Sequence, residues 1–329
     1  MEKTGVTLND VREAASRIRP HIRRTPLLRQ ENMDQAAGCA LHLKPEMLQI
    51  TGAFKLRGAL SKILALSPEE RGKGIITSSS GNHGQACAYA GRMLGIPVTV
   101  VLPEDTPSIK VENARAMGAN IILWDRRYDE RWKKVRREVA DHGYAIVHAY
   151  EDFTVMAGQG TVALEILEDL PDVDAILVPV GGGGLISGIA TAVKETVPRV
   201  RVIGVQAEAS AAYCASRAAG KPVEVACLPT IADGLSCRRP GENPYPIVEK
   251  YVDELVAVDE ESIRRAVRLL ARNAKLVAEP SAGVGIAALL SGAVKTRPGE
   301  KVCAVLTSGN WDVDMIGKIL KAEPVEGVR

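Results

Sequence analysis

The sequence has few aromatic residues, no excess of charge of one sign and no long apolar run. Phenylalanine, tyrosine and tryptophan make up only 4% of the 329 residues, which favours helices on a parallel sheet over an aromatic-rich β-sandwich. Forty-two basic and forty acidic residues leave a formal charge of +2, so the composition provides no basic field for nucleic acid. The longest apolar runs, such as Ala175–Val180, are too short to span a membrane.

Metal-binding and secretory patterns are also missing. The six cysteines include no Cys-x-x-Cys pair and the N-terminus has no apolar signal core, which indicates reduced, packed thiols in a cytoplasmic protein. The five histidines form no His-Glu-x-x-His pattern, so a zinc site is not supported. The 46% of hydrophobic residues instead indicates a globular protein with a full-sized core.

Short apolar runs alternate with helical patterns from residue 74 onward. Parallel strands need crossover helices, so this alternation predicts an α/β fold with parallel sheets. A capping box at Thr7–Asp10 predicts a helix before them. From the alternation we expect two sheet units that divide near residue 150. The expected strands are 74–77, 97–102, 120–124, 144–147, 175–180, 201–206 and 301–306; the expected helices are 82–94, 108–117, 126–140, 154–169, 185–195, 260–273, 282–290 and one from 312.

The strongest local signal is a run of four glycines, Gly181–Gly184, between a buried strand and a helix. Without Cβ atoms the backbone can approach an anion, and the N-terminus of the following helix adds positive potential. The alternative is a flexible turn, but four glycines at a helix start cost stability unless a ligand is bound. A P-loop is excluded because its lysine is missing. A dinucleotide site is only weakly supported, because the acidic residue that it needs, Glu208, lies past the end of the next strand. The run therefore predicts a phosphate-binding site.

Three further motifs lie at strand-to-helix junctions or helix starts. Lys55 follows Phe54 at the start of an apolar helix, where burial would lower the pKa of its amine, as a Schiff-base amine or general base requires. Taken alone, a lysine at such a position is more often an exposed charge. The segment 77–85 offers hydroxyls, an amide and free N–H groups to a carboxylate, or it is an ordinary N-cap. With the segment 306–310, these motifs describe an enzyme that handles a phosphorylated cofactor and an amino acid.

These motifs resemble the fold-type II pyridoxal-phosphate enzymes, specifically the serine/threonine dehydratase and serine racemase family. The resemblance extends from about residue 5 to 320 and implies two open twisted α/β domains like those of the tryptophan synthase β subunit, with the cofactor in the cleft between them. Residues 1–64 and 152–329 would form the large cofactor-binding domain, and residues 65–151 the small substrate-side domain. The motifs that carry the resemblance are Thr51-Gly-Ala-Phe-Lys55, Ser79-Ser-Gly-Asn-His-Gly84, Gly181–Gly184, Ala278-Glu-Pro-Ser-Ala-Gly283 and Ser308-Gly-Asn310.

The resemblance also implies roles for individual residues. Lys55 would hold pyridoxal 5'-phosphate as a Schiff base, and Phe54 would pack near its ring. The substrate carboxylate would be surrounded by Ser79, Ser80, Asn82 and His83, while Gly234 would line the pocket. Further cofactor contacts would come from Gly181, Gly182, Gly183, Gly184 and Leu185 at the phosphate, Asn82 at the ring hydroxyl, Glu279 in the pocket wall and Thr307 at the pyridine nitrogen.

The implied activity is that of a dehydratase, or ammonia-lyase, acting on L-threonine, L-serine or a related β-hydroxy amino acid. The products would be ammonia and a 2-oxo acid, namely 2-oxobutanoate or pyruvate. A neutral hydroxyl at Thr307 cannot keep the pyridine nitrogen protonated as an aspartate would, so loss of a β-substituent is favoured over transamination. Lys55, once displaced by the substrate, would remove the Cα proton as general base.

Three alternatives stay open. Ser80 stands where many dedicated dehydratases have alanine and racemases have a serine that acts as acid and base on the opposite face, so an amino-acid (serine) racemase is the first. The second is a dehydratase specific for another β-hydroxy amino acid, such as threo-3-hydroxyaspartate. The third comes from a different class: a non-catalytic or nucleotide-binding α/β protein that uses the four-glycine loop.

The sequence departs from the family pattern in three places. Ser308 stands where glycine is common, and Trp311 adds bulk beside it. The stretch that holds a divalent cation in racemase-like members corresponds to Gln206–Ala212 and lacks two expected carboxylates; we predict no metal, while a divalent or monovalent cation requirement stays open. The chain ends near residue 329, so no regulatory domain like that of biosynthetic threonine dehydratases is expected. The expected partners are an amino-acid substrate and a second copy in a homodimer, with no nucleic acid and no membrane.

Overall fold

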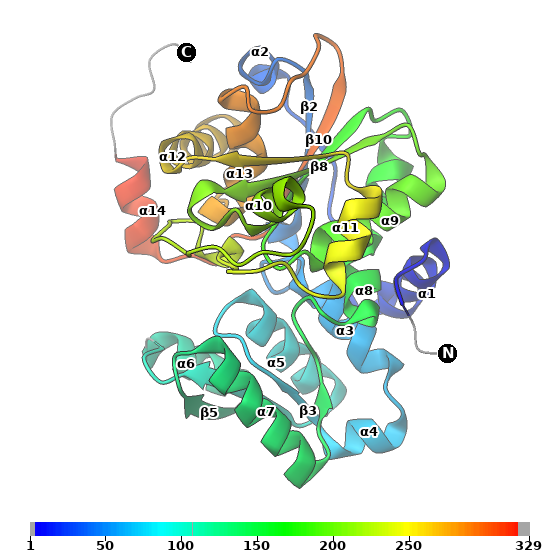
Figure 1. Cartoon of the computed structure of the whole chain (residues 1–329), viewed down its shortest axis with the longest axis vertical. Coiled ribbons are helices and arrows are strands. Elements are labelled where there is room, and N and C mark those ends of the chain that lie inside the picture. Colours follow the sequence, from blue (N-terminus) through cyan, green and yellow to red (C-terminus); the bar gives the residue numbers. More distant parts are fainter. Residues whose placement is uncertain (1–3, 107, 322–329) are drawn as a thin grey trace.

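The computed structural model describes residues 4–106 and 108–321. Two α/β units, one above the other in Figure 1, are each built around a sheet. The predicted α/β class with two open parallel sheets is confirmed, with one antiparallel strand pair at the edge of the larger sheet. Within the described ranges, no helix is long and apolar enough to cross a membrane.

The larger sheet has six strands in the order β1-β2-β10-β7-β8-β9, and only β1 and β2 pair antiparallel. The smaller sheet has the order β5-β4-β3-β6 and is entirely parallel. The strands are β1 (Leu28–Arg29), β2 (Ala40–Pro45), β3 (Ile75–Thr77), β4 (Val98–Pro103), β5 (Asn120–Trp124), β6 (Ala145–Ile146), β7 (Ala175–Pro179), β8 (Arg201–Ala207), β9 (Glu254–Val258) and β10 (Lys301–Leu306).

Helices cover both faces of each sheet. Those of the smaller unit are α4 (Pro68–Lys73), α5 (Asn82–Leu94), α6 (Ser108–Ala116) and α7 (Tyr128–His142). The others are α1 (Leu8–Ile18), α2 (Asp34–Ala37), α3 (Lys55–Ala65), α8 (Phe153–Asp169), α9 (Gly184–Thr196), α10 (Ala212–Ala219), α11 (Pro244–Tyr251), α12 (Glu260–Leu269), α13 (Pro280–Leu290) and α14 (Val313–Leu320).

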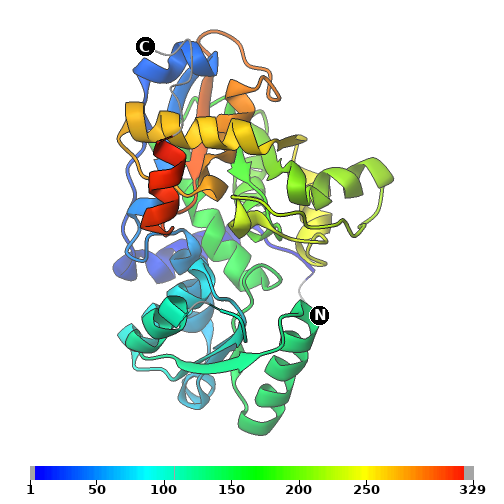
Figure 2. The ribbon, with the colours of Figure 1, turned by 90° about the vertical axis from the view of Figure 1, so that its left-hand side faces the viewer.

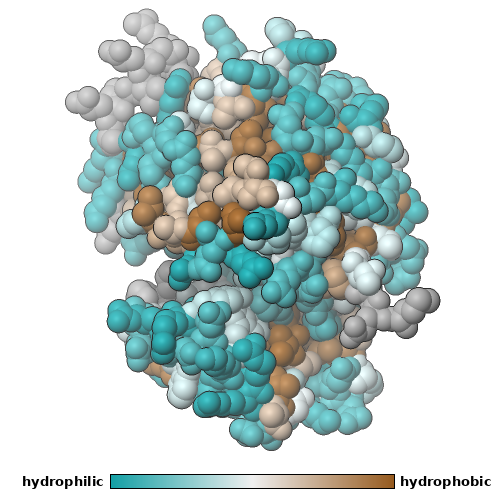
Figure 3. All heavy atoms as spheres, in the orientation of Figure 1, coloured by the Kyte–Doolittle hydropathy of each residue, from teal (hydrophilic) through white to brown (hydrophobic). Residues whose placement is uncertain are grey.

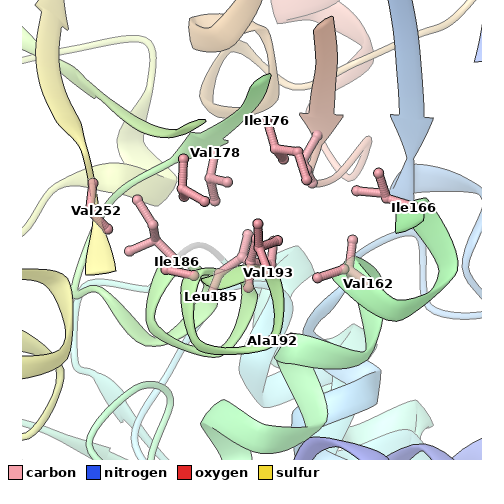
Figure 4. Packing of buried hydrophobic residues seen from close by; sticks show 14 of the residues in the cluster. Val162, Ile166, Ile176, Val178, Leu185, Ile186, Ala192, Val193 and Val252 are labelled. Carbon is pink, nitrogen blue, oxygen red and sulfur yellow. The ribbon is translucent and has the colours of Figure 1, made fainter. Parts of the chain in front are cut away.

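The core of the larger unit follows from the two-residue period of its strands. Ile176 and Val178 of β7 pack with residues of α8 and α9, such as Val162 and Val193 (Figure 4). The residues between them on β7 face the opposite layer, which contains α12 and α13. Because both faces are covered, the strand is apolar throughout rather than alternating.

The chain passes between the two sheets through α3 and through the segment from β6 to α8. Helix α3 packs against α8 and also against α5 of the smaller unit. Figure 2 shows the two units from the side, with α3 and α8 near the level at which they meet. Lys55 is the first residue of α3, so the predicted cofactor-binding lysine lies where the units join.

Most predicted elements are present within a few residues of their predicted bounds, but two predictions need correction. The helix expected at 126–140 begins only at Tyr128, because the N-cap residue Arg127 has an extended backbone. The helix expected at 260–273 is α-helical only to Leu269 and continues as a π-helical turn, Leu270–Ala274. Strands β1, β2 and β9 were not predicted.

Candidate active site

One cavity of about 350 Å³ lies between the two units, at the carboxyl ends of strands from both sheets. The surface is also hollowed between the units on the left of the space-filling view (Figure 3). The cavity brings together every site residue predicted from the sequence: Phe54, Lys55, Ser79, Ser80, Asn82, His83, Gly181, Gly182, Gly183, Gly184, Leu185, Gly234, Glu279 and Thr307. Their individual roles stay predictions. Three further lining residues, Ser78, Ser281 and Asn310, lie in the predicted motifs but were given no individual role. Lining residues outside those motifs include Tyr128, Arg131, Tyr150, Asp233 and Cys237.

Lys55 has the environment of a reactive amine. Its Nζ donates a hydrogen bond to the carbonyl oxygen of Ala149 at 3.1 Å and lies 5.0 Å from the centroid of the Phe54 ring. Burial lowers the pKa of the Lys55 amine to about 8, so a larger fraction of it is neutral and nucleophilic near neutral pH. The backbone N–H of Phe54 donates to the Thr307 carbonyl at 3.1 Å, which fixes the start of α3 against the end of β10.

Steric crowding requires glycine in the loop after β7. A Cβ on Gly182 would lie 2.4 Å from the ring of Tyr150, and a Cβ on Gly183 would lie 1.9 Å from the hydroxyl of Tyr213. Gly183 also has a φ of 97°, in the left-handed region that other residues rarely adopt. The Tyr213 hydroxyl donates to the Gly182 carbonyl at 3.1 Å, so the protein itself occupies this acceptor.

The N–H groups of the same loop are available to an anion. Those of Gly181–Gly183 donate to no acceptor in the described part of the chain, and those of Gly184 and Leu185 belong to the unpaired first turn of α9. The described cavity wall contains only two lysine or arginine side chains, Lys55 and Arg131. Backbone N–H groups and the N-terminus of α9 would therefore supply most of the attraction for a phosphate. The phosphate of pyridoxal phosphate fits this set of donors.

The loop between β3 and α5 supplies a second group of donors. The N–H groups of Asn82 and His83 belong to the unpaired first turn of α5. The His83 ring donates from Nε2 to the Val147 carbonyl at 2.9 Å, and burial, followed by the charge of Lys55, lowers the pKa of His83 to about 3. Its Nδ1 then carries a lone pair and cannot donate to a carboxylate. A carboxylate in this loop would therefore use the backbone N–H of His83 rather than its ring.

A hydrogen-bond network crosses the cavity between the two units. The Glu279 carboxylate accepts from Asn82 Nδ2 at 3.2 Å and from the backbone N–H of Asn310 at 2.6 Å. Asn310 Nδ2 in turn donates to Asn82 Oδ1 at 2.9 Å. Burial raises the pKa of the Glu279 carboxyl, and these donors oppose that shift. The network joins α5 to the N-terminus of α13 and to the segment after β10.

Two tyrosines of the cavity wall were not predicted from the sequence. The hydroxyls of Tyr128 and Tyr150 lie 2.9 Å apart, and the Tyr128 hydroxyl is 3.2 Å from His148 Nε2. His148 Nδ1 accepts from the N–H groups of Tyr150 and Glu151, so Nε2 carries the proton and donates to Tyr128. Because Tyr150 follows the carboxyl end of β6, its position in the sequence could have indicated that it lines the cavity. Tyr128 and Arg131 lie on a highly charged helix, whose pattern does not single them out.

The departures from the family pattern have different consequences. Ser308 lines the cavity, whereas Trp311 is not among the described residues that line it. The stretch 206–212 forms the end of β8 and the turn after it. In residues 4–106 and 108–321, no group of three histidine, cysteine, aspartate or glutamate side chains is placed to hold a metal ion.

Comparison with known proteins gives the family. The model of a family described as "Pyridoxal-phosphate dependent enzyme" matches residues 18–308. The chain therefore belongs to the pyridoxal-phosphate dependent enzymes. Within them it is a fold-type II member of the threonine dehydratase and serine racemase family.

Three relatives illustrate this membership. The L-threonine ammonia-lyase of Thermotoga maritima is 44% identical over 324 residues, which cover 98% of this chain and 80% of the relative. The T.th. threonine deaminase, known from a crystal structure, is 41% identical to this chain, and the two structures superpose with a TM-score of 0.87. The match covers 93% of this chain and 99% of the deaminase chain. The serine racemase from Dictyostelium discoideum, also known from a crystal structure, is 35% identical with a TM-score of 0.88. This match covers 94% of this chain and 99% of the racemase chain.

Proposed function

We propose that this protein is an L-threonine ammonia-lyase that also accepts L-serine, and that it releases ammonia and a 2-oxo acid. The observation that carries the proposal is one cavity that contains the Lys55 amine together with the N–H donors of two loops. One loop suits a phosphate and the other a carboxylate. The 44% identity to an L-threonine ammonia-lyase supports this substrate.

Two groups of residues would hold the cofactor. Lys55 Nζ would bind it covalently, and the N–H groups of Gly181–Gly184 and Leu185 would bind its phosphate. The Thr307 hydroxyl would face the pyridine nitrogen and, being neutral, would not keep it protonated. When bound, pyridoxal phosphate withdraws electrons from the Cα of the substrate.

The remaining steps use groups of the chain. The first turn of α5, with Ser79, Ser80, Asn82 and the backbone N–H of His83, would hold the substrate carboxylate and fix its orientation. Lys55 Nζ would then take the Cα proton, which its lowered pKa permits near neutral pH. Loss of the β-hydroxyl as water gives an enamine, and its hydrolysis gives 2-oxobutanoate from threonine or pyruvate from serine.

A lysine substitution tests the proposal. In Lys55→Ala, elimination from L-threonine should fall to background, because both the covalent attachment point and the base are lost. The measurement is 2-oxo acid release from a panel of β-hydroxy amino acids, with circular dichroism to verify the fold. Lys73→Ala is the control, since Lys73 is exposed on α4 and pairs with Glu69. Turnover retained by Lys55→Ala would refute the assigned role.

Racemisation is the second candidate function, and Ser80 is the observation that favours it. The Ser79 hydroxyl accepts from the Gly81 N–H at 3.3 Å and that of Ser78 accepts from Arg131, whereas the Ser80 hydroxyl makes no hydrogen bond within the described ranges. It is free to return a proton to Cα. Chiral analysis of the serine remaining after reaction with L-serine decides between the functions, because substantial D-serine would identify a racemase.

The proposal keeps two further expectations from the sequence, a homodimer and a cytoplasmic location. Sedimentation equilibrium of the purified protein tests the first, and cell fractionation tests the second. A monomer at micromolar concentration would contradict the homodimer without affecting the assignment of the active site.

A further inference from the structure

A chain of hydrogen bonds with one direction runs from His148 to Tyr150. His148 Nδ1 accepts the backbone N–H groups of Tyr150 and Glu151, so the ring proton is on Nε2. That proton is donated to the Tyr128 hydroxyl at 3.2 Å, which in turn lies 2.9 Å from the Tyr150 hydroxyl. Because successive hydrogen bonds polarise one another in the same sense, Tyr128 donates to Tyr150. The His148 ring is held by stacking on Trp132, with ring centroids 4.3 Å apart.

The chain ends in a proton that the protein itself does not use. The Tyr150 oxygen accepts from Tyr128, and in residues 4–106 and 108–321 its own proton has no other acceptor at hydrogen-bonding distance. Burial raises the pKa of the Tyr150 phenol well above its usual value, so this hydroxyl stays protonated and remains a donor. Since Tyr150 lines the cavity, a bound ligand can accept the unused hydrogen bond.

Tyr150 adjoins both Lys55 and the four-glycine loop. The carbonyl of the preceding residue, Ala149, accepts the hydrogen bond of Lys55 Nζ at 3.1 Å. The Tyr150 ring packs on Gly182, where a Cβ would lie 2.4 Å from it. The unused phenol proton therefore belongs to the part of the wall that contains the proposed base.

The β-hydroxyl is the one reacting group of the substrate that still lacks a partner. In the proposed function the amine joins the cofactor, the Cα proton goes to Lys55, and the carboxylate lies at the first turn of α5. The β-oxygen is two bonds from Cα, so it comes close to the residues around Lys55. Hydroxide is a poor leaving group unless an acid protonates it as the C–O bond breaks. The cofactor phosphate, by contrast, already has the N–H donors of Gly181–Gly184 and Leu185.

We propose that Tyr150 is a catalytic residue whose phenol donates its proton to the departing β-hydroxyl. This inference rests on the proposed elimination and adds an acid to its base. Lys55 Nζ takes the Cα proton, and the electron pair left on Cα forms the Cα–Cβ double bond. The β C–O bond breaks as the Tyr150 proton moves to the oxygen, which leaves as water. The proton held by Lys55 then restores the phenol, so both groups are ready for the next turnover.

The experiment compares, on the holoenzyme, two substrates that differ in their leaving group. L-Serine loses hydroxide, which needs a proton, whereas β-chloro-L-alanine loses chloride, which needs none; both give the same enamine and therefore pyruvate. In Tyr150→Phe, the ratio of kcat for serine to kcat for chloroalanine should fall about 100-fold or more, the usual contribution of a general acid. The KM for serine should change little, because the interaction strengthens only as the C–O bond breaks.

Two further variants serve as comparisons. Tyr128→Phe leaves the Tyr150 proton in place but removes the neighbour that polarises it, so the ratio should fall by a smaller factor. Tyr245→Phe removes a phenol hydroxyl from α11, outside the described cavity lining, and should leave the ratio unchanged. Tyr150→Phe keeps the ring that packs on Gly182, so its circular dichroism spectrum and its affinity for pyridoxal phosphate should match those of the wild type.

The proposal is wrong if Tyr150→Phe lowers kcat equally for both substrates or for neither, because the phenol would then not act on the leaving group. It is also wrong if the variant mainly weakens pyridoxal phosphate binding, since the hydroxyl would then serve the phosphate. A wild type that releases pyruvate from neither substrate would contradict the proposed function itself. An unchanged ratio beside an active wild type would overturn only the role of Tyr150.

Discussion

The buried ion cluster next to Lys55 gives the sharpest prediction of stability. Arg57 lies two residues after Lys55 on α3, and its side chain and that of Glu46 have no exposed area. Lys44 is also buried and pairs with Glu165 at 2.6 Å. The cluster thus has two cations and two anions, with no net charge. Replacing Arg57 by methionine leaves Glu46 buried, and among the described residues the Thr25 hydroxyl, at 2.6 Å, is then the one remaining hydrogen-bond partner of its carboxylate.

We expect Arg57→Met to lower the free energy of unfolding by about 3–5 kcal/mol, because removal of one partner leaves an uncompensated buried charge. Adding Glu46→Gln restores neutrality, so the double variant should recover part of this loss although it has lost two charged side chains. Urea unfolding followed by circular dichroism measures both. The control is Arg24→Met, which removes an exposed arginine paired with Glu168 and should cost at most about 1 kcal/mol.

Two results would refute this reasoning. A loss below about 1 kcal/mol for Arg57→Met would mean that the cluster is solvated or can rearrange. A double variant less stable than the single one would mean that the hydrogen bonds of Glu46, rather than its unpaired charge, dominate the energetics.

Three further predictions concern pH and the glycine loop. Covalent capture of pyridoxal phosphate by the apoprotein needs the neutral Lys55 amine, so its rate should rise about tenfold per pH unit and level off above pH 8; a rise that continues to pH 10 would indicate an ordinary lysine. Burial alone would raise the pKa of Glu165, but the hydrogen bonds and charges of Arg57 and Lys44 together outweigh it and the pKa is lowered. The stabilisation is therefore complete above the unfolded value near 4.5 and is lost as pH falls through the folded pKa, so Glu165→Gln should flatten acid unfolding curves in that range. Gly183→Ala should cost at least about 1–2 kcal/mol from backbone strain alone and should weaken phosphate binding, and an unchanged melting temperature and cofactor affinity would contradict the crowding seen at Tyr213.

Residues that act through local backbone geometry could be predicted from the sequence. The four glycines after β7 and the serine loop after β3 stand at strand-to-helix junctions, and one rule about the carboxyl ends of parallel strands finds both. The same rule applies to Tyr150, which follows β6 but was overlooked. Strand–helix alternation likewise gave nearly all the elements between residues 74 and 206.

Residues that depend on distant partners could not be predicted. Strand β2 contains Lys44, and a lysine in a short apolar run argues against a buried strand unless its partner, Glu165 on α8, is known. Arg131 poses the same difficulty, since its helix reads as a charged surface helix. Only the three-dimensional arrangement shows that this arginine, like Tyr128, lines the cavity while the other residues around it on α7 face solvent or pack inward.

The two passages of the chain between the sheets have a mechanical consequence. Lys55 is the first residue of α3, which leads from the larger unit to the smaller one. Its hydrogen bond, 3.1 Å long, goes to the carbonyl of Ala149, just after β6, in the segment that leads back to the larger unit. A rotation of one sheet against the other would pivot about these two segments. The active-site amine is thus hydrogen-bonded across the pivot itself, where relative displacement is smallest, while the Asn82 to Glu279 contact also spans the two units and would report their opening.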